Sequence, residues 1–163
     1  MQWCHLQLFL ETQTQETIIN MANLSASTGI DSNKTQLGIF QFSNGSDSGN
    51  YIHMETTITQ PSSNVMMMLE AVGYNYGGGN PIRCSWNFYS YAYPIGNTNN
   101  GYAGMNADGI YYTSAGYVAI RAYAGSPYYI GFTLNAYPTA GNGTGQPIGI
   151  RRVSQNSNGG SYY

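Results

Sequence analysis

The pattern of apolar and polar positions is organised around residues 65–91, where two extended runs flank the glycine-rich turn 77–81. Every second residue of the later run is apolar, which is the period of a β-strand with one face in a core; these residues are Ile82, Cys84, Trp86 and Phe88. The earlier run is apolar on both faces, with Val65, Met67, Leu69 and Ala71 on one and Met66, Met68 and Val72 on the other. A strand that is apolar on both faces is covered on both, so the sequence places this hairpin either in the middle of a sandwich or at a contact between subunits.

The rest of the chain contains shorter segments of the same kind, separated by turns rich in glycine, proline and asparagine. We predict strands at residues 36–42, 51–59, 110–112, 116–124, 128–137 and 148–153, and a long loop at residues 92–105. In the second of these strands one face is polar and is expected to meet solvent or a partner, with Tyr51, His53, Glu55 and Thr57. This pattern predicts an all-β fold, an antiparallel, jelly-roll-like β-sandwich of about eight strands over residues 36–154.

The two ends of the chain differ from this pattern. Residues 1–35 are expected to form an N-terminal arm, either a helical anchor or a start-site extension ahead of a natural chain that begins at Met21. The apolar residues 3–10 have no basic segment before them and no small-residue cleavage site after them, so we expect neither a signal peptide nor a membrane span. Residues 155–163 are polar and rich in glycine, serine and asparagine, which predicts a flexible tail.

Charged residues make up 7% of the chain, against about 25% of an average soluble domain, while glycine and tyrosine number 21 and 16. A polar surface with little charge is typical of secreted or virion-exposed β-proteins, and tyrosine favours contacts with sugars and other proteins. The formal net charge of −2 and the scattered cations give no electrostatic footprint for nucleic acid, which is not expected as a partner. Two cysteines are too few for a disulfide scaffold, so Cys84 is interpreted as a buried free thiol.

The residues that usually carry catalysis are sparse. No nucleophile, metalloprotease or phosphate-loop motif occurs, so no catalytic residue and no cofactor is expected. Glu55 and Glu70 are the one pair of carboxylates that a glycosidase could use, on strands that could be neighbours. The stronger interpretation is that Glu70 forms an ion pair with Arg83 or Arg121. Three copies of His53 could meet on the axis of a trimer and bind a metal, but a structural histidine beside Glu55 is favoured and no metal site is predicted.

Tyrosines concentrate at the predicted turns, next to asparagine and glycine. Three loops combine aromatic rings with amide or hydroxyl groups, at residues 74–80, 91–102 and 126–129. Rings can stack on sugars while amides bind hydroxyl groups, and the alternative is that these rings pack between subunits. Because the first two loops flank opposite ends of the strand at 82–91, we do not expect them to share one end of the sandwich. The predicted ligand site is therefore the tip of the hairpin, formed by Tyr74, Asn75, Tyr76 and Asn80.

Four short stretches carry a resemblance to a known group of proteins: residues 51–56 (YIHMET), 73–77 (GYNYG), 114–121 (SAGYVAIR) and 131–136 (GFTLNA). On these stretches the chain resembles small β-rich virion proteins of tailed phages, in particular those of marine T4-like cyanophages. The resemblance implies a non-enzymatic tail-fibre tip or surface appendage, commonly a homotrimer, that binds a host-surface glycan or protein and contacts other virion proteins. A structural capsid-decoration or assembly protein is the alternative, because the chain lacks the long repetitive shaft of a full fibre. Both readings imply a location in the virion, after synthesis in the host cytoplasm.

Overall fold

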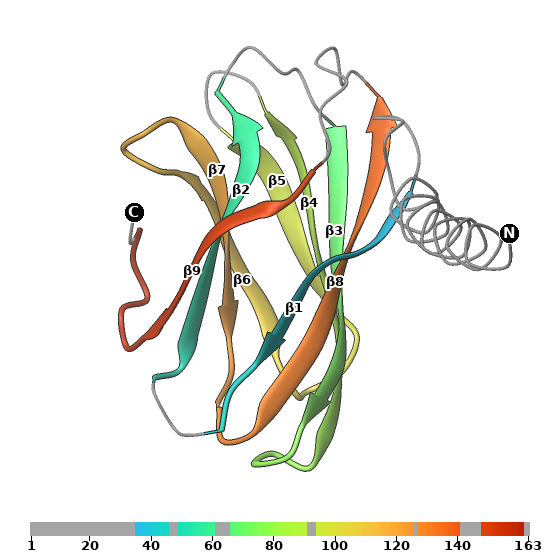
Figure 1. The fold of residues 1–163 in the computed structure, drawn as a ribbon, viewed down its shortest axis with the longest axis vertical. Helices are drawn as coiled ribbons and strands as arrows, with labels where there is room; N and C mark the ends of the chain where they lie inside the picture. The colour runs from blue at the N-terminus through green and yellow to red at the C-terminus, as the bar shows by residue number, and fades with distance from the viewer. Residues whose placement is uncertain are drawn as a thin grey trace, which may run out of the picture.

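The computed structural model describes residues 35–45, 49–60, 66–90, 94–125, 127–140 and 148–161, and the regular secondary structure in these ranges is all β-strand (Figure 1). The nine strands are β1 (Gln36–Ser43), β2 (Tyr51–Thr59), β3 (Met66–Asn75), β4 (Asn80–Ser90), β5 (Pro94–Asn100), β6 (Asn106–Tyr112), β7 (Tyr117–Tyr123), β8 (Ile130–Ala140) and β9 (Ile150–Asn156). Within the described ranges, no helix has the length and apolar character needed to cross a membrane. The predicted arm at residues 1–35 lies outside these ranges, apart from Thr35.

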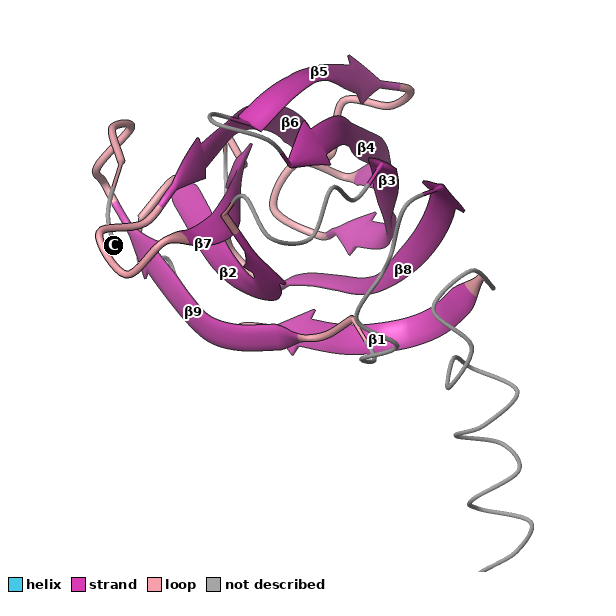
Figure 2. Ribbon diagram, turned by 90° about the horizontal axis from the view of Figure 1, so that it is seen from above, coloured by secondary structure: helices cyan, strands magenta, loops and turns pink. Residues whose placement is uncertain are grey.

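The strands form two sheets packed face to face, one of five strands in the order β1-β8-β3-β4-β5 and one of four in the order β6-β7-β2-β9 (Figure 2). All the pairs are antiparallel. The pair β2–β7 is nested inside the pair β1–β8 along the chain, like the arms of one long hairpin wound around the core, as in a jelly roll. The prediction of an antiparallel all-β sandwich is confirmed, with nine strands instead of about eight.

The hairpin of β3 and β4 lies in the five-stranded sheet, where β3 is flanked on both sides by other strands. The predicted faces are confirmed, because the inward residues are buried, namely Met67, Leu69, Ala71, Ile82, Cys84, Trp86 and Phe88. On the outer face of β3, Met66 and Val72 are 46% and 44% exposed. Burying a large apolar side chain stabilises the fold by about 2 kcal/mol, so this hairpin is a main source of stability. The Nε1 group of Trp86 also donates to the carbonyl oxygen of Arg121 in the other sheet at 2.8 Å, which ties the two layers together.

The long loop predicted at residues 92–105 is wrong over much of its length, because residues 94–100 form β5 beside β4. The segment PIGNTNN shows no alternation of apolar and polar residues, so its sequence did not predict a strand. Asn100, at its end, bonds to both backbone groups of Ala107: the Ala107 N–H donates to Oδ1 at 2.6 Å, and Nδ2 donates to the Ala107 carbonyl at 3.4 Å. This amide takes the place of a backbone pair between β5 and β6, where the two sheets meet.

Side-chain amides also join the sheets at the opposite edge, where β1 is the edge strand of one sheet and β9 that of the other (Figure 2). Gln36 Oε1 accepts a hydrogen bond from the backbone N–H of Ile148, just ahead of β9, at 3.0 Å. Asn44 Nδ2, just past the end of β1, donates to Gln155 Oε1 at 3.0 Å. Hydrogen bonds from amide side chains therefore link the sheets where the backbone ladders stop.

The outer face of the four-stranded sheet is covered at its centre, which corrects the expectation that His53 and Glu55 meet solvent or a partner. Both side chains are fully buried. Residues 157–161, which belong to the predicted tail, fold back over this face. The carbonyl oxygen of Asn158 accepts from His53, and that of Gly160 accepts from Arg121. The strand β9 itself extends to Asn156, into the segment that was predicted as a tail.

Candidate ligand-binding tip

The turn between β3 and β4 closes the long hairpin at one end of the sandwich. The Gly79 N–H donates to the carbonyl oxygen of Tyr76 at 3.0 Å, and Gly79 has a φ of 63°, which glycine adopts without the steric strain of a side chain. Asn75 Oδ1 accepts from the Gly78 N–H at 3.1 Å, and Asn80 Nδ2 donates to the Gly78 carbonyl at 2.6 Å. Hydrogen bonds within the turn therefore hold the backbone that carries Tyr76.

The loop ahead of β8 lies against this turn and brings two more tyrosines to it. The Tyr76 N–H donates to the Tyr129 carbonyl at 3.2 Å, and the Gly77 N–H donates to the Tyr128 carbonyl at 2.9 Å. We name Tyr76, Tyr128 and Tyr129 the tip cluster. Their ring centroids lie 4.4 Å apart for Tyr128 and Tyr129, 6.2 Å for Tyr76 and Tyr129, and 6.4 Å for Tyr76 and Tyr128. The planes of the three rings are inclined to one another by 50° to 87°. The exposed fraction is 63% for Tyr76, 44% for Tyr128 and 50% for Tyr129.

Tyr129 is held in a backbone conformation that tyrosine rarely adopts, with a φ of 49°. Such a conformation costs about 1 kcal/mol or more and persists only where the surroundings impose it. Here Asn44 holds both sides of the loop, because its Oδ1 accepts from the Ile130 N–H at 2.8 Å and its Nδ2 donates to the Pro127 carbonyl at 2.7 Å. Strain of this kind gathers at functional sites, and here it sets an exposed ring beside Tyr76.

Of the four residues predicted for the site, only Tyr76 belongs to the tip cluster. Tyr74 is 51% exposed but stands on the outer face of the five-stranded sheet, which it shares with Val72 by the alternation of β3. Asn75 is 2% exposed, and its Nδ2 donates to the Gly104 carbonyl at 2.7 Å, so this side chain supports the turn from beneath. Asn80 is partly exposed and caps the turn, as described above.

Tyr128 and Tyr129 belong to a predicted loop separate from that of Tyr76, and nothing in their local sequence pattern indicates that the three residues meet. Their convergence follows from the pairing of β3 with β8, in which Asn75 lies opposite Ile130. The turn after β3, which carries Tyr76, and the loop before β8, which carries Tyr128 and Tyr129, therefore lie at the same end of the sheet.

Residues 101–105 also reach this end of the sandwich, which corrects the expectation that the segment 91–102 stays at the opposite end. Because β5 runs back along β4, the Gly101 N–H donates to the Arg83 carbonyl at 2.8 Å and the Gly104 N–H donates to the Pro81 carbonyl at 3.2 Å. Tyr102 in this loop is 52% exposed, and among the described ring contacts none joins it to the tip cluster.

The two carboxylates considered for glycoside hydrolysis do not form a pair. Glu55 lies on β2 and Glu70 on β3, which belong to different sheets, so the expectation that their strands are neighbours is wrong. Arg152 donates to both oxygens of Glu55, at 2.7 and 2.8 Å, and these bonds hold the pKa of that buried carboxyl below its usual value. Glu70 accepts from Arg83 Nε at 2.9 Å, which is one of the two partners predicted for it. Each carboxylate is therefore engaged in its own ion pair, on opposite faces of the sandwich.

His53 is held by hydrogen bonds at both ring nitrogens. Because a carbonyl oxygen only accepts, Nε2 carries the proton and donates to Asn158 at 2.8 Å, and Nδ1 accepts from the Tyr111 hydroxyl at 2.9 Å. Burial lowers the pKa of the imidazole below its ordinary value of 6.5, which keeps it neutral at pH 7. In the part of the chain that the structure describes, no three His, Cys, Asp or Glu side chains gather into a metal site. His53 is therefore a buried side chain whose two ring nitrogens are both hydrogen-bonded within the fold.

Cys84 is a buried free thiol, as predicted. Burial raises the pKa of its thiol to about 12, so the reactive thiolate does not form near neutral pH. Its one possible disulfide partner within the chain, Cys4, lies outside the described residues.

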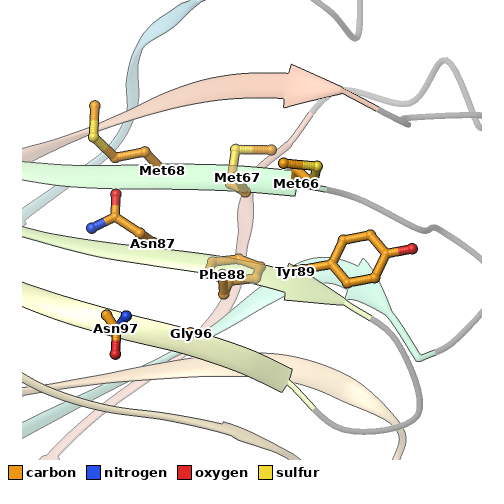
Figure 3. Close-up of a pocket in the computed structure, with 8 residues that line it drawn as sticks. All are labelled: Met66, Met67, Met68, Asn87, Phe88, Tyr89, Gly96 and Asn97. Carbon is orange, nitrogen blue, oxygen red and sulfur yellow. The ribbon is translucent and has the colours of Figure 1, made fainter.

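A shallow depression of about 390 Å³ lies at the end of β3 and β4 away from the tip (Figure 3). It is lined by residues of β3, β4 and β5, among them Met66, Met68, Asn87, Tyr89 and Asn97. Its apolar walls continue the outer surface of the five-stranded sheet.

A scan against protein-family models, a search of curated proteins and a search of solved structures each found no match for this chain. The interpretation of the tip therefore depends on its geometry and on the resemblance carried by the four short stretches.

Proposed function

We propose that the protein is a non-enzymatic attachment protein of a phage virion, a tail-fibre tip or surface appendage, which binds a glycan or protein on the host surface through the tip cluster. The observation that carries the proposal is the meeting of Tyr76, Tyr128 and Tyr129. These exposed rings come from two distant segments and stand on backbone fixed by hydrogen bonds.

The exposure of these rings distinguishes them from aromatic residues that serve the fold. Trp86 and Phe88 in the core are 0% and 5% exposed, whereas every ring of the tip cluster is at least 44% exposed. A contact between aromatic groups contributes about 1 kcal/mol beyond the area it buries. A backbone that is already ordered lowers the entropy cost of binding, so a rigid tip of exposed rings suits recognition.

The position of the cluster supports the same role. Loops at one end of a β-sandwich commonly carry binding sites, because the sheets fix them while leaving their side chains free. Two of the four stretches that resemble phage virion proteins, residues 73–77 and 131–136, adjoin the tip.

The proposed assembly is a homotrimer that contacts other virion proteins. On the outer face of the five-stranded sheet Met66 and Val72 are 46% and 44% exposed, with Met68 between them on the same face. Apolar side chains gathered on one exposed face are usual at subunit contacts. The same face favours a second candidate function, a structural capsid-decoration or assembly protein whose tyrosines serve assembly alone.

Binding of the fluorescently labelled protein to intact cells tests the proposal. We expect saturable binding to some strains in a panel of marine cyanobacteria, the hosts that the resemblance implies. The double variant Tyr76→Ala/Tyr129→Ala should bind at least about tenfold more weakly. Tyr102→Ala is the matched control, because its ring is equally exposed but lies outside the tip cluster.

The two candidate functions give different results in this experiment. Binding that the double variant retains, with its melting temperature unchanged, would show that the tip cluster is not the site. A protein that binds no strain but joins purified virions or capsids would instead have the structural role.

A further inference from the structure

We infer that the ligand of the tip cluster is an uncharged carbohydrate, a neutral glycan built of pyranose rings. This inference rests on the function proposed above and narrows its ligand from a glycan or protein of any kind to one chemical class.

The described segments that carry and adjoin the tip cluster contain no charged residue. Residues 74–82, 101–107 and 122–135 lack Asp, Glu, Lys, Arg and His altogether. In the loop after β1, Asp47 is acidic and lies outside the described residues. An acidic side chain near the tip would repel an anionic ligand, so it does not weaken the inference.

An anionic glycan needs a cationic partner, and the arginines of this chain are already paired. The ion pairs are Arg83 with Glu70, Arg121 with Asp108, and both Arg151 and Arg152 with Glu55. The remaining cation, Lys34, lies outside the described residues. Proteins recognise carboxylate and sulfate groups chiefly with guanidinium and ammonium groups. The described surface at the tip therefore offers an anionic sugar no strong partner.

The tip cluster does offer the groups that a neutral sugar uses. The planes of Tyr76 and Tyr129 meet at 87°, and those of Tyr128 and Tyr129 at 77°, so the rings contact edge to face while each stays at least 44% exposed. The C–H face of a pyranose can stack on one such exposed ring, as apolar groups do on aromatic rings. The phenolic hydroxyl groups both donate and accept hydrogen bonds, as sugar hydroxyl groups require.

The size of the exposed surface favours a sugar over a protein partner. A stable protein interface buries about 800 Å² on each side. A tyrosine offers about 200 Å² when fully exposed, so three half-exposed tyrosines present about 300 Å². The residues that adjoin the cluster, at 77–80, are glycine and asparagine and add little apolar area. An area of this size fits one or two sugar rings, and firm attachment then comes from several copies binding one polymer.

The experiment uses the full-length protein, immobilised in many copies, against soluble polysaccharides. Galactan, dextran and mannan are the neutral probes, and alginate and chondroitin sulfate are the anionic ones. We expect retention of at least one neutral polysaccharide and of neither anionic one. Retention should change by less than about twofold between about 0.05 M and about 0.5 M NaCl, because no charge is involved. The Tyr76→Ala/Tyr129→Ala variant should lower the affinity at least about tenfold, and Tyr102→Ala should leave it unchanged.

The outcomes separate this inference from the proposed function. Retention of anionic polysaccharides alone, or retention that high salt abolishes, overturns the inference and leaves an attachment role intact. Periodate treatment of the cells destroys surface sugars. If binding survives this treatment but is lost in the double variant, the receptor is a protein, and the inference of a glycan ligand is overturned while the attachment role stands. Retention of a neutral polysaccharide that the double variant keeps overturns the assignment to the tip cluster. A protein that binds neither cells nor any polysaccharide overturns both.

Discussion

Asn44 and Ile130 form a reciprocal pair although 86 positions separate them in the chain. The backbone N–H of Asn44 donates to the Ile130 carbonyl at 3.1 Å, and the Ile130 N–H donates to Asn44 Oδ1 at 2.8 Å. The side chain thus continues the β1–β8 ladder beyond its last backbone pair. Because the same amide also reaches Pro127, it holds both ends of the loop that carries Tyr128 and Tyr129.

Asn44→Ala should weaken binding at the tip and lower stability together. The substitution leaves the Ile130 N–H without its acceptor, which costs about 1–3 kcal/mol where that group is shielded from water. Gln155→Ala is the matched control, because it removes the contact between Gln155 and Asn44 but keeps the Ile130 pair. Urea denaturation and polysaccharide retention measure the two effects. If Asn44→Ala retains polysaccharide as well as the wild type does, Tyr129 keeps its conformation without the hydrogen bonds from Asn44.

Tyr129→Gly should separate strain from recognition. Glycine adopts a φ of 49° freely, so the variant regains about 1 kcal/mol of strain, offset in part by the larger backbone entropy of glycine in the unfolded chain. We therefore expect it to unfold at or above the wild-type urea midpoint while binding more weakly. Tyr128→Gly has no positive φ to relieve and should be less stable than wild type. Equal destabilisation of the two glycine variants would contradict the strain at Tyr129.

Stability should decrease as the pH falls below neutrality, because of His53. Burial lowers the pKa of its imidazole from the ordinary 6.5, so the unfolded chain takes up this proton more readily than the folded one. The contribution of neutral His53 is thus complete above about pH 6.5 and is lost as the pH falls towards the folded-state pKa. A second positive charge would then lie near Arg121, and Nδ1 could no longer accept from Tyr111.

Melting temperatures at about pH 7.5 and about pH 5.5 measure this effect, and His53→Gln should reduce the difference between them. The carboxyl of Glu55 affects stability in a lower pH range, because the hydrogen bonds from Arg152 hold its pKa below the ordinary 4.5. Its contribution is lost only as the pH falls below about 4.5, and His53→Gln should leave that loss in place. A His53→Gln profile identical to wild type would assign the acid sensitivity to other groups.

The two arginine–glutamate pairs should differ in their importance for stability. Arg152→Ala leaves the fully buried Glu55 with Arg151 as its one remaining arginine, at 3.3 Å, and we expect a loss of about 2 kcal/mol. Breaking a buried pair can cost about 3–5 kcal/mol, and the half-exposed Arg152 and the remaining Arg151 reduce that figure. Arg83→Ala breaks a pair whose arginine is exposed to solvent, and it should therefore cost less than Arg152→Ala. Urea denaturation of the two variants under identical conditions gives the comparison, and equal losses would contradict it.

Adjacent methionines of β3 should respond in opposite ways to aspartate. Met66→Asp places a charge on the outer face and should dissociate the proposed trimer while leaving the fold intact, whereas Met67, 3% exposed, faces the core. Met67→Asp should therefore unfold the domain, since a buried unpaired charge costs several kcal/mol at an order-of-magnitude level. Static light scattering reports the first outcome and circular dichroism the second. A wild-type protein that is monomeric at micromolar concentration would remove the trimer from the proposal.

The hairpin of β3 and β4 was predictable because its core positions follow a strict period of two, from Leu69 and Ala71 to Trp86. The strand β5 was not, because PIGNTNN owes its structure to backbone pairing with β4 and to the amide of Asn100. Neither interaction leaves a hydrophobic pattern in the sequence.

Part of the site was predictable from the same alternation. Asn75 was predicted at the ligand site, although the alternation that places it on the same face as Leu69 and Ala71 is enough to identify an inward side chain. The meeting of Tyr76 with Tyr129 was not predictable, because it depends on the register between β3 and β8. Register is weakly specified by a strand that is apolar on both faces, since a shift by one residue exchanges one apolar face for another.

Amide side chains at the edges of the two sheets bear on whether separate copies of the protein can pair through their strands. An unpaired strand margin is a template onto which a second chain can add, and this is a common route to aggregation. Asn100 occupies both backbone groups of Ala107 at one margin, while Gln36 and Asn44 bond across the other. At Ala107 and Ile148 a neighbouring copy finds backbone groups that are already bonded, which disfavours the addition of its own strand there.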